Sequence, residues 1–136
     1  MANQTIARAY IKNVDQTPRK ISLVAGLVRG RTVADSLIIL SHTPKRAAKA
    51  VVKAIESARS NAVNNGNVDQ KTLVISTISI TTGTRMKRFK PASRGRALPF
   101  QKKSSNILIE VTGDVKEKKK ASAKPAEKTI EQKESK

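Results

Sequence analysis

The densest cluster of chemically active side chains in this sequence lies between Thr82 and Lys103. The segment contains no acidic residue, and its basic residues number eight: Arg85, Lys87, Arg88, Lys90, Arg94, Arg96, Lys102 and Lys103. Guanidinium groups bind phosphate oxygens through paired N–H donors, and ammonium groups bind them as point charges. Because eight like charges repel one another, the segment cannot pack on a core of its own. We therefore expect it to bind a polyanion.

Groups suited to catalysis are scarce. The single histidine, His42, stands at a helix junction, where we expect an exposed or capping role. Five of the ten acidic residues lie in positions 114–136 and the others occur singly, so neither a carboxylate pair nor a metal cluster is expected. Cysteine is absent, which excludes thiolate ligands and disulfides. We predict that the protein is not an enzyme and uses no cofactor or metal.

The charge of the chain points to the same kind of partner. There are 28 Lys and Arg against 10 Asp and Glu, a formal net charge of +18, and residues 1–113 contain 20 of the basic and 5 of the acidic residues. An excess of this size is typical of proteins that bind nucleic acid. Only Tyr10, Phe89 and Phe100 are aromatic, which argues against a single strand stacked base by base on rings. In so basic a segment, we expect Phe89 and Phe100 to wedge or stack against bases.

No targeting or membrane segment is apparent. The longest apolar runs fall well short of the roughly 20 residues that span a bilayer, and the N-terminus lacks the pattern of a secretory signal. We therefore expect a soluble, cytoplasmic protein that binds no membrane.

The basic segment lies between two apolar runs, residues 73–80 and 106–112, both rich in β-branched residues. Each run is typical of a strand, and a structureless loop of this length is improbable in a compact domain. We predict that the strands continue into the basic segment and that only a short tip turns. Pro91, Ser93 and Gly95 provide the turn chemistry there.

Upstream, the pattern predicts a strand over residues 5–12, which displays Arg8 and Lys12, and then three helices. The first helix starts with Thr17 as N-cap and Pro18 in the first position, and Gly30 follows its last apolar residue. The expected apolar residues of this helix are Ile21, Val24, Leu27 and Val28. The second begins at Thr32, with Asp35 as its capping-box partner.

The third helix should be the longest, from Thr43–Pro44 to Asn65–Gly66. Its core stripe is Ala48, Val51, Ile55, Ala58 and Ala62. Lys45, Lys49 and Lys53 form a row on another face, for which a solvated surface is slightly favoured over RNA contact. The predicted fold class is α+β: a small antiparallel sheet of about three strands packed against three helices, with a long protruding β-hairpin arm.

We expect one domain, residues 1–113, in which residues 73–112 form the hairpin arm. Residues 114–136 lack a core-forming pattern and are dominated by Lys, Glu, Ala and Ser. This composition predicts a disordered tail.

Composition alone leaves RNA and DNA open. A long arm with few aromatic residues suits insertion between packed helices of a folded RNA. An architectural protein that bends DNA could use a similar arm in the minor groove, and should then dimerise. An enzyme acting on RNA is the remaining alternative, and the lack of a catalytic cluster makes it remote.

Several motifs resemble one known family. The stretches 17–21 and 27–30 are similar to the first-helix signature of the bacterial large-subunit ribosomal protein twenty-two family (the universal L-twenty-two family). The stretches 45–48, 56–58 and 61–65 resemble it too, and above all Met86–Ala97. Together these motifs extend over residues 5–112 in the family's order.

The resemblance implies a structural constituent of the large ribosomal subunit that binds ribosomal RNA and supports subunit assembly in the cytoplasm. It also implies that the hairpin reaches the wall of the peptide exit tunnel. The expected partners are large-subunit ribosomal RNA, neighbouring ribosomal proteins and, at the hairpin tip, the nascent peptide. DNA binding and homo-oligomer formation are not expected.

Two sets of site residues follow from this reading. The expected residues that bind ribosomal RNA are Arg8, Lys12, Arg19, Lys20, Arg85, Lys87, Arg88, Lys90, Arg94, Arg96, Lys102 and Lys103. The expected residues at the tunnel-lining tip are Met86, Lys87, Arg88, Phe89, Lys90, Pro91, Ala92, Ser93, Arg94, Gly95 and Arg96.

Overall fold

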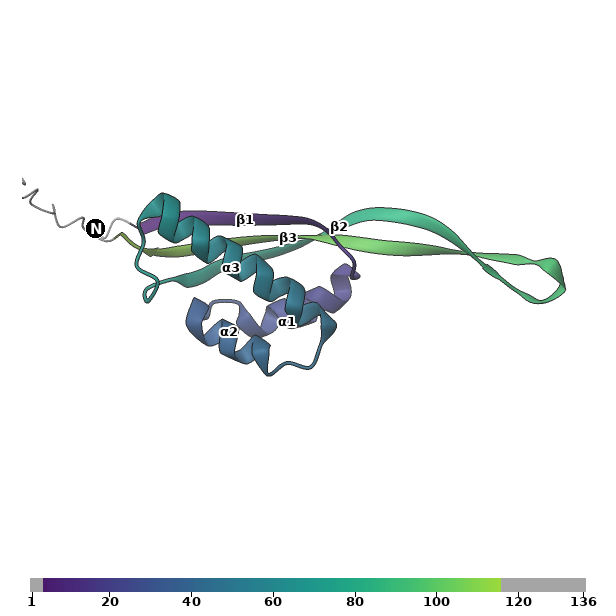
Figure 1. Cartoon of the computed structure of the whole chain (residues 1–136), viewed down its shortest axis with the longest axis horizontal. Helices are drawn as coiled ribbons and strands as arrows, with labels where there is room; N and C mark the ends of the chain where they lie inside the picture. The colour runs from purple at the N-terminus through teal and green to yellow at the C-terminus, as the bar shows by residue number, and fades with distance from the viewer. Residues whose placement is uncertain (1–3, 116–136) are drawn as a thin grey trace, which may run out of the picture.

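The computed structural model describes residues 4–115 and contains a three-stranded antiparallel sheet, three α-helices and a long hairpin (Figure 1). In chain order the elements are β1 (Gln4–Val14), α1 (Pro18–Val28), α2 (Val33–Ser41), α3 (Arg46–Gly66), β2 (Val74–Pro91), a 3₁₀ turn (Ser93–Gly95) and β3 (Ala97–Asp114). The predicted α+β fold class is confirmed. No helix in this part of the chain is long and apolar enough to cross a membrane.

Strand β3 lies at the centre of the sheet, in the order β1-β3-β2, and pairs antiparallel with both neighbours. Its burial alternates regularly: Ile107, Ile109 and Val111 are buried, and the residues between them are half-buried. Successive side chains of a strand point to opposite faces, so one face of β3 belongs to the core. Where the register between neighbouring strands shifts, the extra residue lies in β1 or β2 and not in β3.

Helix α3 packs against β1 and β3, and α1 packs against α3 and β2. The predicted stripe of α3 is confirmed, because Ala48, Val51, Ile55, Ala58 and Ala62 are all buried. In α1, three of the four apolar residues noted in the sequence are buried together with Ala25, whereas Leu27 is 46% exposed.

Thr32 caps α2 as predicted, and Asp35 contacts it through the Thr32 hydroxyl. The Thr32 hydroxyl accepts a hydrogen bond from the Asp35 N–H (3.2 Å) and donates one to the Asp35 carboxylate (2.7 Å). The predicted cap of α3 at Thr43 is wrong, since α3 begins at Arg46 and the Thr43 hydroxyl donates to the Ile39 carbonyl of α2 (2.8 Å). Thr43 therefore ends one helix instead of starting the next.

Gly30 has the positive φ expected after a helix, +73°. Its N–H, however, donates to the Ile75 carbonyl of β2 (3.2 Å) instead of closing α1. The residue thus joins the link between α1 and α2 to the edge of the sheet.

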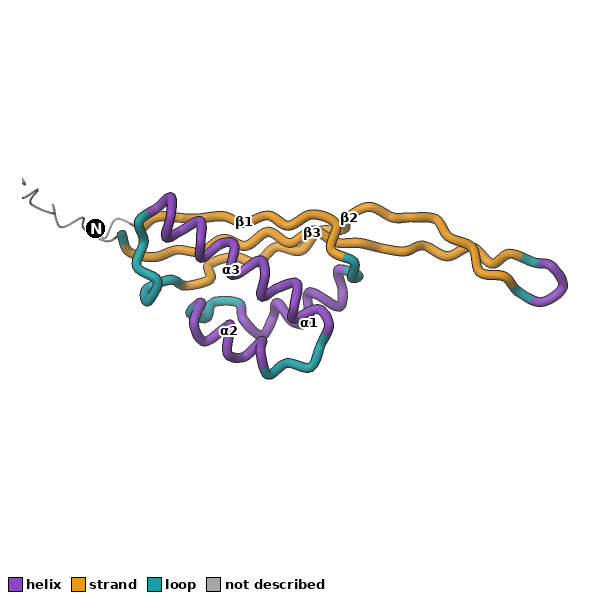
Figure 2. The backbone as a smooth tube through the Cα atoms, in the orientation of Figure 1, coloured by secondary structure: helices purple, strands orange, loops and turns teal. Residues whose placement is uncertain are grey.

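The hairpin extends well beyond the body, from the end opposite the N-terminus (Figure 2). Strand β1 stops at Val14, which pairs with Ser105, whereas β2 and β3 stay paired as far as Pro91 and Ala97. Residues 84–103, named here the projecting arm, therefore form a ribbon of two strands. Arg94 and Gly95 both have positive φ, +55° and +68°, and reverse the chain where the sequence predicted the turn.

The arm leaves the sheet at an irregular junction. Asn13, with a φ of +55°, donates its N–H to the Asn106 side chain (3.0 Å), and its own side-chain oxygen accepts from the Thr84 hydroxyl (3.1 Å). At Gly83 an added Cβ would lie 2.7 Å from the Ser104 Oγ and 3.1 Å from the Ser104 carbonyl carbon. A side chain at position 83 would therefore force Ser104 or the paired strand to shift.

Strand pairing continues two residues beyond the predicted domain limit at residue 113. Strand β3 ends at Asp114, and Val115 forms a bridge with Val68. The rest of the predicted tail, residues 116–136, lies outside the described residues.

Replacement of Gly83 by alanine should lower the free energy of unfolding by about 1–3 kcal/mol, because the new methyl group overlaps the Ser104 hydroxyl and crowds the backbone of the opposite strand. Gly26 of α1 is the matched control, since an added Cβ there meets nothing within 4 Å. Gly26→Ala should raise the free energy of unfolding by about 0.5–1 kcal/mol through helix propensity. Urea denaturation followed by circular dichroism measures both, and a stabilising Gly83→Ala would contradict the packing described.

Candidate nucleic-acid interface

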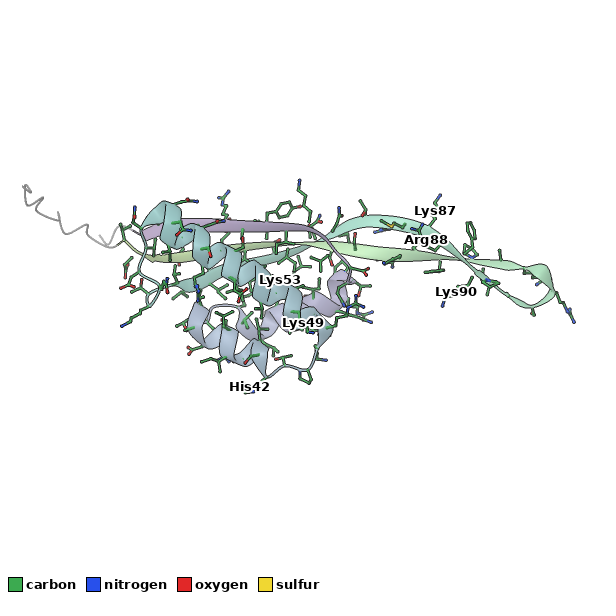
Figure 3. All side chains as sticks on the ribbon, in the orientation of Figure 1. His42, Lys49, Lys53, Lys87, Arg88 and Lys90 are labelled. Atoms are coloured by element: carbon green, nitrogen blue, oxygen red, sulfur yellow. The ribbon has the colours of Figure 1, made fainter. Side chains whose placement is uncertain are left out.

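The projecting arm has no core of its own. Between residues 84 and 103 every side chain is exposed except that of Ala92, which is half-buried. The eight cations predicted to bind a polyanion all lie on this ribbon or at its base. Figure 3 shows Lys87 and Lys90 pointing to opposite sides of it.

Strand pairing divides the arm into two faces, because directly opposed residues share a face. On the odd face the pairs are Arg85–Lys103, Lys87–Gln101 and Phe89–Pro99; on the even face they are Met86–Lys102, Arg88–Phe100 and Lys90–Leu98. Each face thus combines cations with apolar side chains. A partner that meets only one face would leave half of these groups unused.

Contacts within the arm are few and involve the even face. The Lys90 ammonium lies 5.4 Å from the centre of the Phe100 ring, and Arg88 donates a long bond to the Met86 sulfur (3.5 Å). Phe89, on the odd face, is 68% exposed. Its ring is exposed to a partner, and stacking against a base stays a prediction.

One acidic residue contacts the arm. The Asp15 carboxylate lies 3.1 Å from the Lys102 ammonium and 3.6 Å from the Arg46 guanidinium at the start of α3. Within residues 4–115, Lys102 is the only one of the eight arm cations in an ion pair. The remaining seven have no compensating carboxylate there.

The predicted site residues of the body fall into two places. On β1, Arg8 forms an ion pair with Glu110 (3.0 Å), and the Lys12 ammonium lies 5.6 Å from the centre of the Tyr10 ring. Arg19 and Lys20 are exposed in the first turn of α1. Arg8 is therefore partly neutralised by the protein itself, whereas Arg19 is not.

The structure contains a second basic area, between β1 and α3, that the sequence did not predict. A groove of about 380 Å³ between the end of β1 and α3 is lined by Lys12, Arg46, Lys49 and Lys53, among others. Lys49 and Lys53 project from one side of α3 (Figure 3). The four-residue spacing of the lysine row was visible in the sequence, but its proximity to Lys12 depends on how α3 crosses β1.

The described residues contain no cluster of three or more acidic or histidine side chains that could hold a metal ion. His42 is exposed at the end of α2, away from the arm (Figure 3).

A basic α+β body that carries an exposed arm without acidic residues defines a class of protein that binds a folded polyanion. The sequence profile of the family described as ribosomal protein L22p/L17e matches residues 9–112. The chain belongs to this family, as its motifs indicated. It is thus a structural protein of the large ribosomal subunit in the cytoplasm, where it binds ribosomal RNA and lies among other ribosomal proteins. It is not an enzyme.

Binding to ribosomal RNA should depend steeply on salt. With about six to eight phosphate contacts, the logarithm of the association constant should fall against the logarithm of salt concentration with a slope of roughly −5 to −7. Lys87→Gln should make the slope less steep by about one unit. Lys102→Gln should change it less, because Asp15 already compensates that ammonium group. Filter binding across a salt series measures the slopes, and equal slopes for the two variants would contradict this ranking.

Proposed function

We propose that the arm passes between helices of ribosomal RNA and that its tip, Met86–Arg96, borders the peptide exit tunnel and the nascent chain. The observation that carries the proposal is the projecting arm itself: a two-stranded ribbon, exposed on both faces, with basic residues and no acid. The body then remains outside as the anchor. On this proposal the protein acts as a single copy in the subunit and binds no DNA.

The physical reason for a surrounding RNA partner is the instability of the arm alone. A ribbon of two strands is marginally stable in water, and its cations repel one another. RNA helices on both faces would supply phosphates for the cations and surfaces for the exposed Phe89 and Leu98. Neutralisation of phosphate by the arm in turn lets RNA helices approach each other, which is how the protein would support assembly.

The shape of the tip favours a position beside a lumen. The chain reverses within Ser93–Gly95, and Ala92 and Ser93 at its start are small and uncharged. Arg94 and Arg96 flank Gly95, are exposed, and would bind RNA phosphates. The tip can therefore reach into a narrow passage while its arginines contact the RNA wall.

We assign the twelve cations predicted from the sequence to ribosomal RNA, with those of the arm contributing more than Arg8, which Glu110 neutralises in part. We also propose that residues 1–113 act as one RNA-binding domain. The segment from residue 114 on is then dispensable for the interface.

Charge reversal in the arm should impair assembly. Arg88→Glu with Arg94→Glu should lower incorporation of the chain into large subunits at least about tenfold, since like charges placed against phosphates cost more than the roughly 1.4 kcal/mol that a factor of ten represents. The control is Lys118→Glu with Lys119→Glu, which reverses the same number of charges in the tail. Sedimentation of tagged chains from DNase-treated lysate gives the distribution.

Equal profiles for the two double variants would count against the arm. Migration of the unaltered protein as a free dimer, or with DNA, would reject the ribosomal placement of the arm altogether.

Proximity of the tip to the nascent chain can be tested by cross-linking. A photoreactive residue in place of Ser93 should cross-link to the nascent peptide in stalled ribosomes. The same residue in place of Thr77, which is exposed on the body, should not. Cross-links from position 93 to RNA or protein of the subunit alone would place the tip away from the tunnel lumen.

A further inference from the structure

Three cations from separate elements surround one pocket at the base of the arm. The pocket measures about 330 Å³ and is lined by Thr17, Pro18, Arg19, Thr82, Arg85, Lys103 and Ser104. We name it the junction pocket. Arg19 comes from α1, Arg85 from β2 and Lys103 from β3, so the pocket spans the boundary between body and arm. None of its lining residues is acidic.

The register of the strands makes this grouping costly in the free protein. Arg85 lies directly opposite Lys103, and like charges directly opposed on one face of an antiparallel pair are destabilising. Most other cations of the arm face an uncharged residue, as Lys87 faces Gln101. A bound anion would turn the repulsion between Arg85 and Lys103 into attraction to a common partner.

No group of the described protein supplies that anion. Within residues 4–115, the side chains of Arg19, Arg85 and Lys103 form no ion pair and no hydrogen bond. The acid at the junction, Asp15, lines a different pocket, together with Lys102. Since Lys102 and Lys103 are neighbours on a regular strand, they point to opposite faces, and Asp15 serves only one of them.

The start of α1 adds to the positive potential. Thr17 stands at the N-cap, but its side chain makes no capping bond, and the first turn contains no acidic residue. The N-terminal end of a helix carries a partial positive charge that favours anions. This contribution reinforces the three side chains, on which the site chiefly depends.

We propose that the junction pocket binds one backbone phosphodiester of RNA and thereby secures the arm against α1. The two free oxygens of a phosphodiester can accept hydrogen bonds from the Arg19 and Arg85 guanidinium groups and from Lys103. The proposal rests on the proposed function for the source of the phosphate, and it adds a specific consequence. Occupancy relieves the repulsion in the strand pair, so RNA binding stiffens the base of the arm.

The first experiment titrates inorganic phosphate into the full chain at constant ionic strength and follows backbone amides by ¹H–¹⁵N NMR. The amides of Arg19, Arg85 and Lys103 should shift and saturate together. The shifts should be lost in Lys103→Gln and retained in Arg31→Gln, which removes an exposed cation outside every pocket and ion pair described above. Shifts spread evenly over all exposed cations would mean general screening and would overturn the proposal.

The second experiment uses Lys103→Glu, which should stabilise the free protein and weaken its binding to phosphate and RNA. A carboxylate opposite Arg85 replaces repulsion with attraction, so the melting temperature should rise by about 2–5 °C. Affinity for phosphate should be lost, and affinity for ribosomal RNA should fall at least about tenfold relative to Arg31→Gln. A lower melting temperature for Lys103→Glu would mean that Arg85 and Lys103 do not repel each other in the free protein. That result would reject this account of the pocket, even if binding also falls.

The two proposals fail in different ways. If Arg88→Glu with Arg94→Glu enters large subunits as well as the tail control, the proposed function of the arm is wrong, while the NMR titration still reports on the pocket. If that double variant is excluded from large subunits and Lys103→Glu binds ribosomal RNA as well as Arg31→Gln, the proposed function stands and the phosphate site is wrong.

Discussion

The structure depends on the continuity of one strand. Strand β3 begins at the tip of the arm and continues as the central strand of the sheet, where Ile107, Ile109 and Val111 are buried. The direction of the exposed arm is therefore set by pairing and packing inside the body. The extra residues that bend the sheet lie in β1 and β2, so β3 itself stays regular. A continuous central strand is a physically simple way to project a segment that cannot stabilise itself.

Local signals account for the part of the fold that the sequence predicted. The stripe of Ala48, Val51 and Ile55 repeats with the period of a helix, and the capping box of Thr32 and Asp35 needs only three residues of chain. Such features depend only on residues within one or two turns of the same helix. The hairpin was predicted from composition, because a long structureless loop between two strand-like runs is improbable in a compact domain.

What the sequence did not predict depends on contacts between distant segments. Thr43 resembles an N-cap, but its hydroxyl bonds backward to Ile39, which is an equally local alternative that propensity alone does not rank. The requirement for Gly83 arises from Ser104, on the opposite strand. For the candidate site, the individual cations were recognisable by type, whereas the grouping of Arg19 with Arg85 and Lys103 required the position of α1 relative to the arm.

The junction between body and arm shows how protein and RNA can divide the task of compensating charge. Lys102 and Lys103 are adjacent and face opposite sides. The protein supplies the anion for Lys102 through Asp15, which also contacts Arg46 at the start of α3 and so ties the arm to the body on that side. On the other side Arg85 and Lys103 face each other, and the proposed RNA phosphate would complete the arrangement. Within the described residues, a single ion pair, Lys102 to Asp15, thus secures the arm to the body, and it lies on one face. The other face would become favourable when the proposed phosphate binds. A carboxylate on both faces would stabilise the free protein but would repel the RNA at the point where the arm enters it.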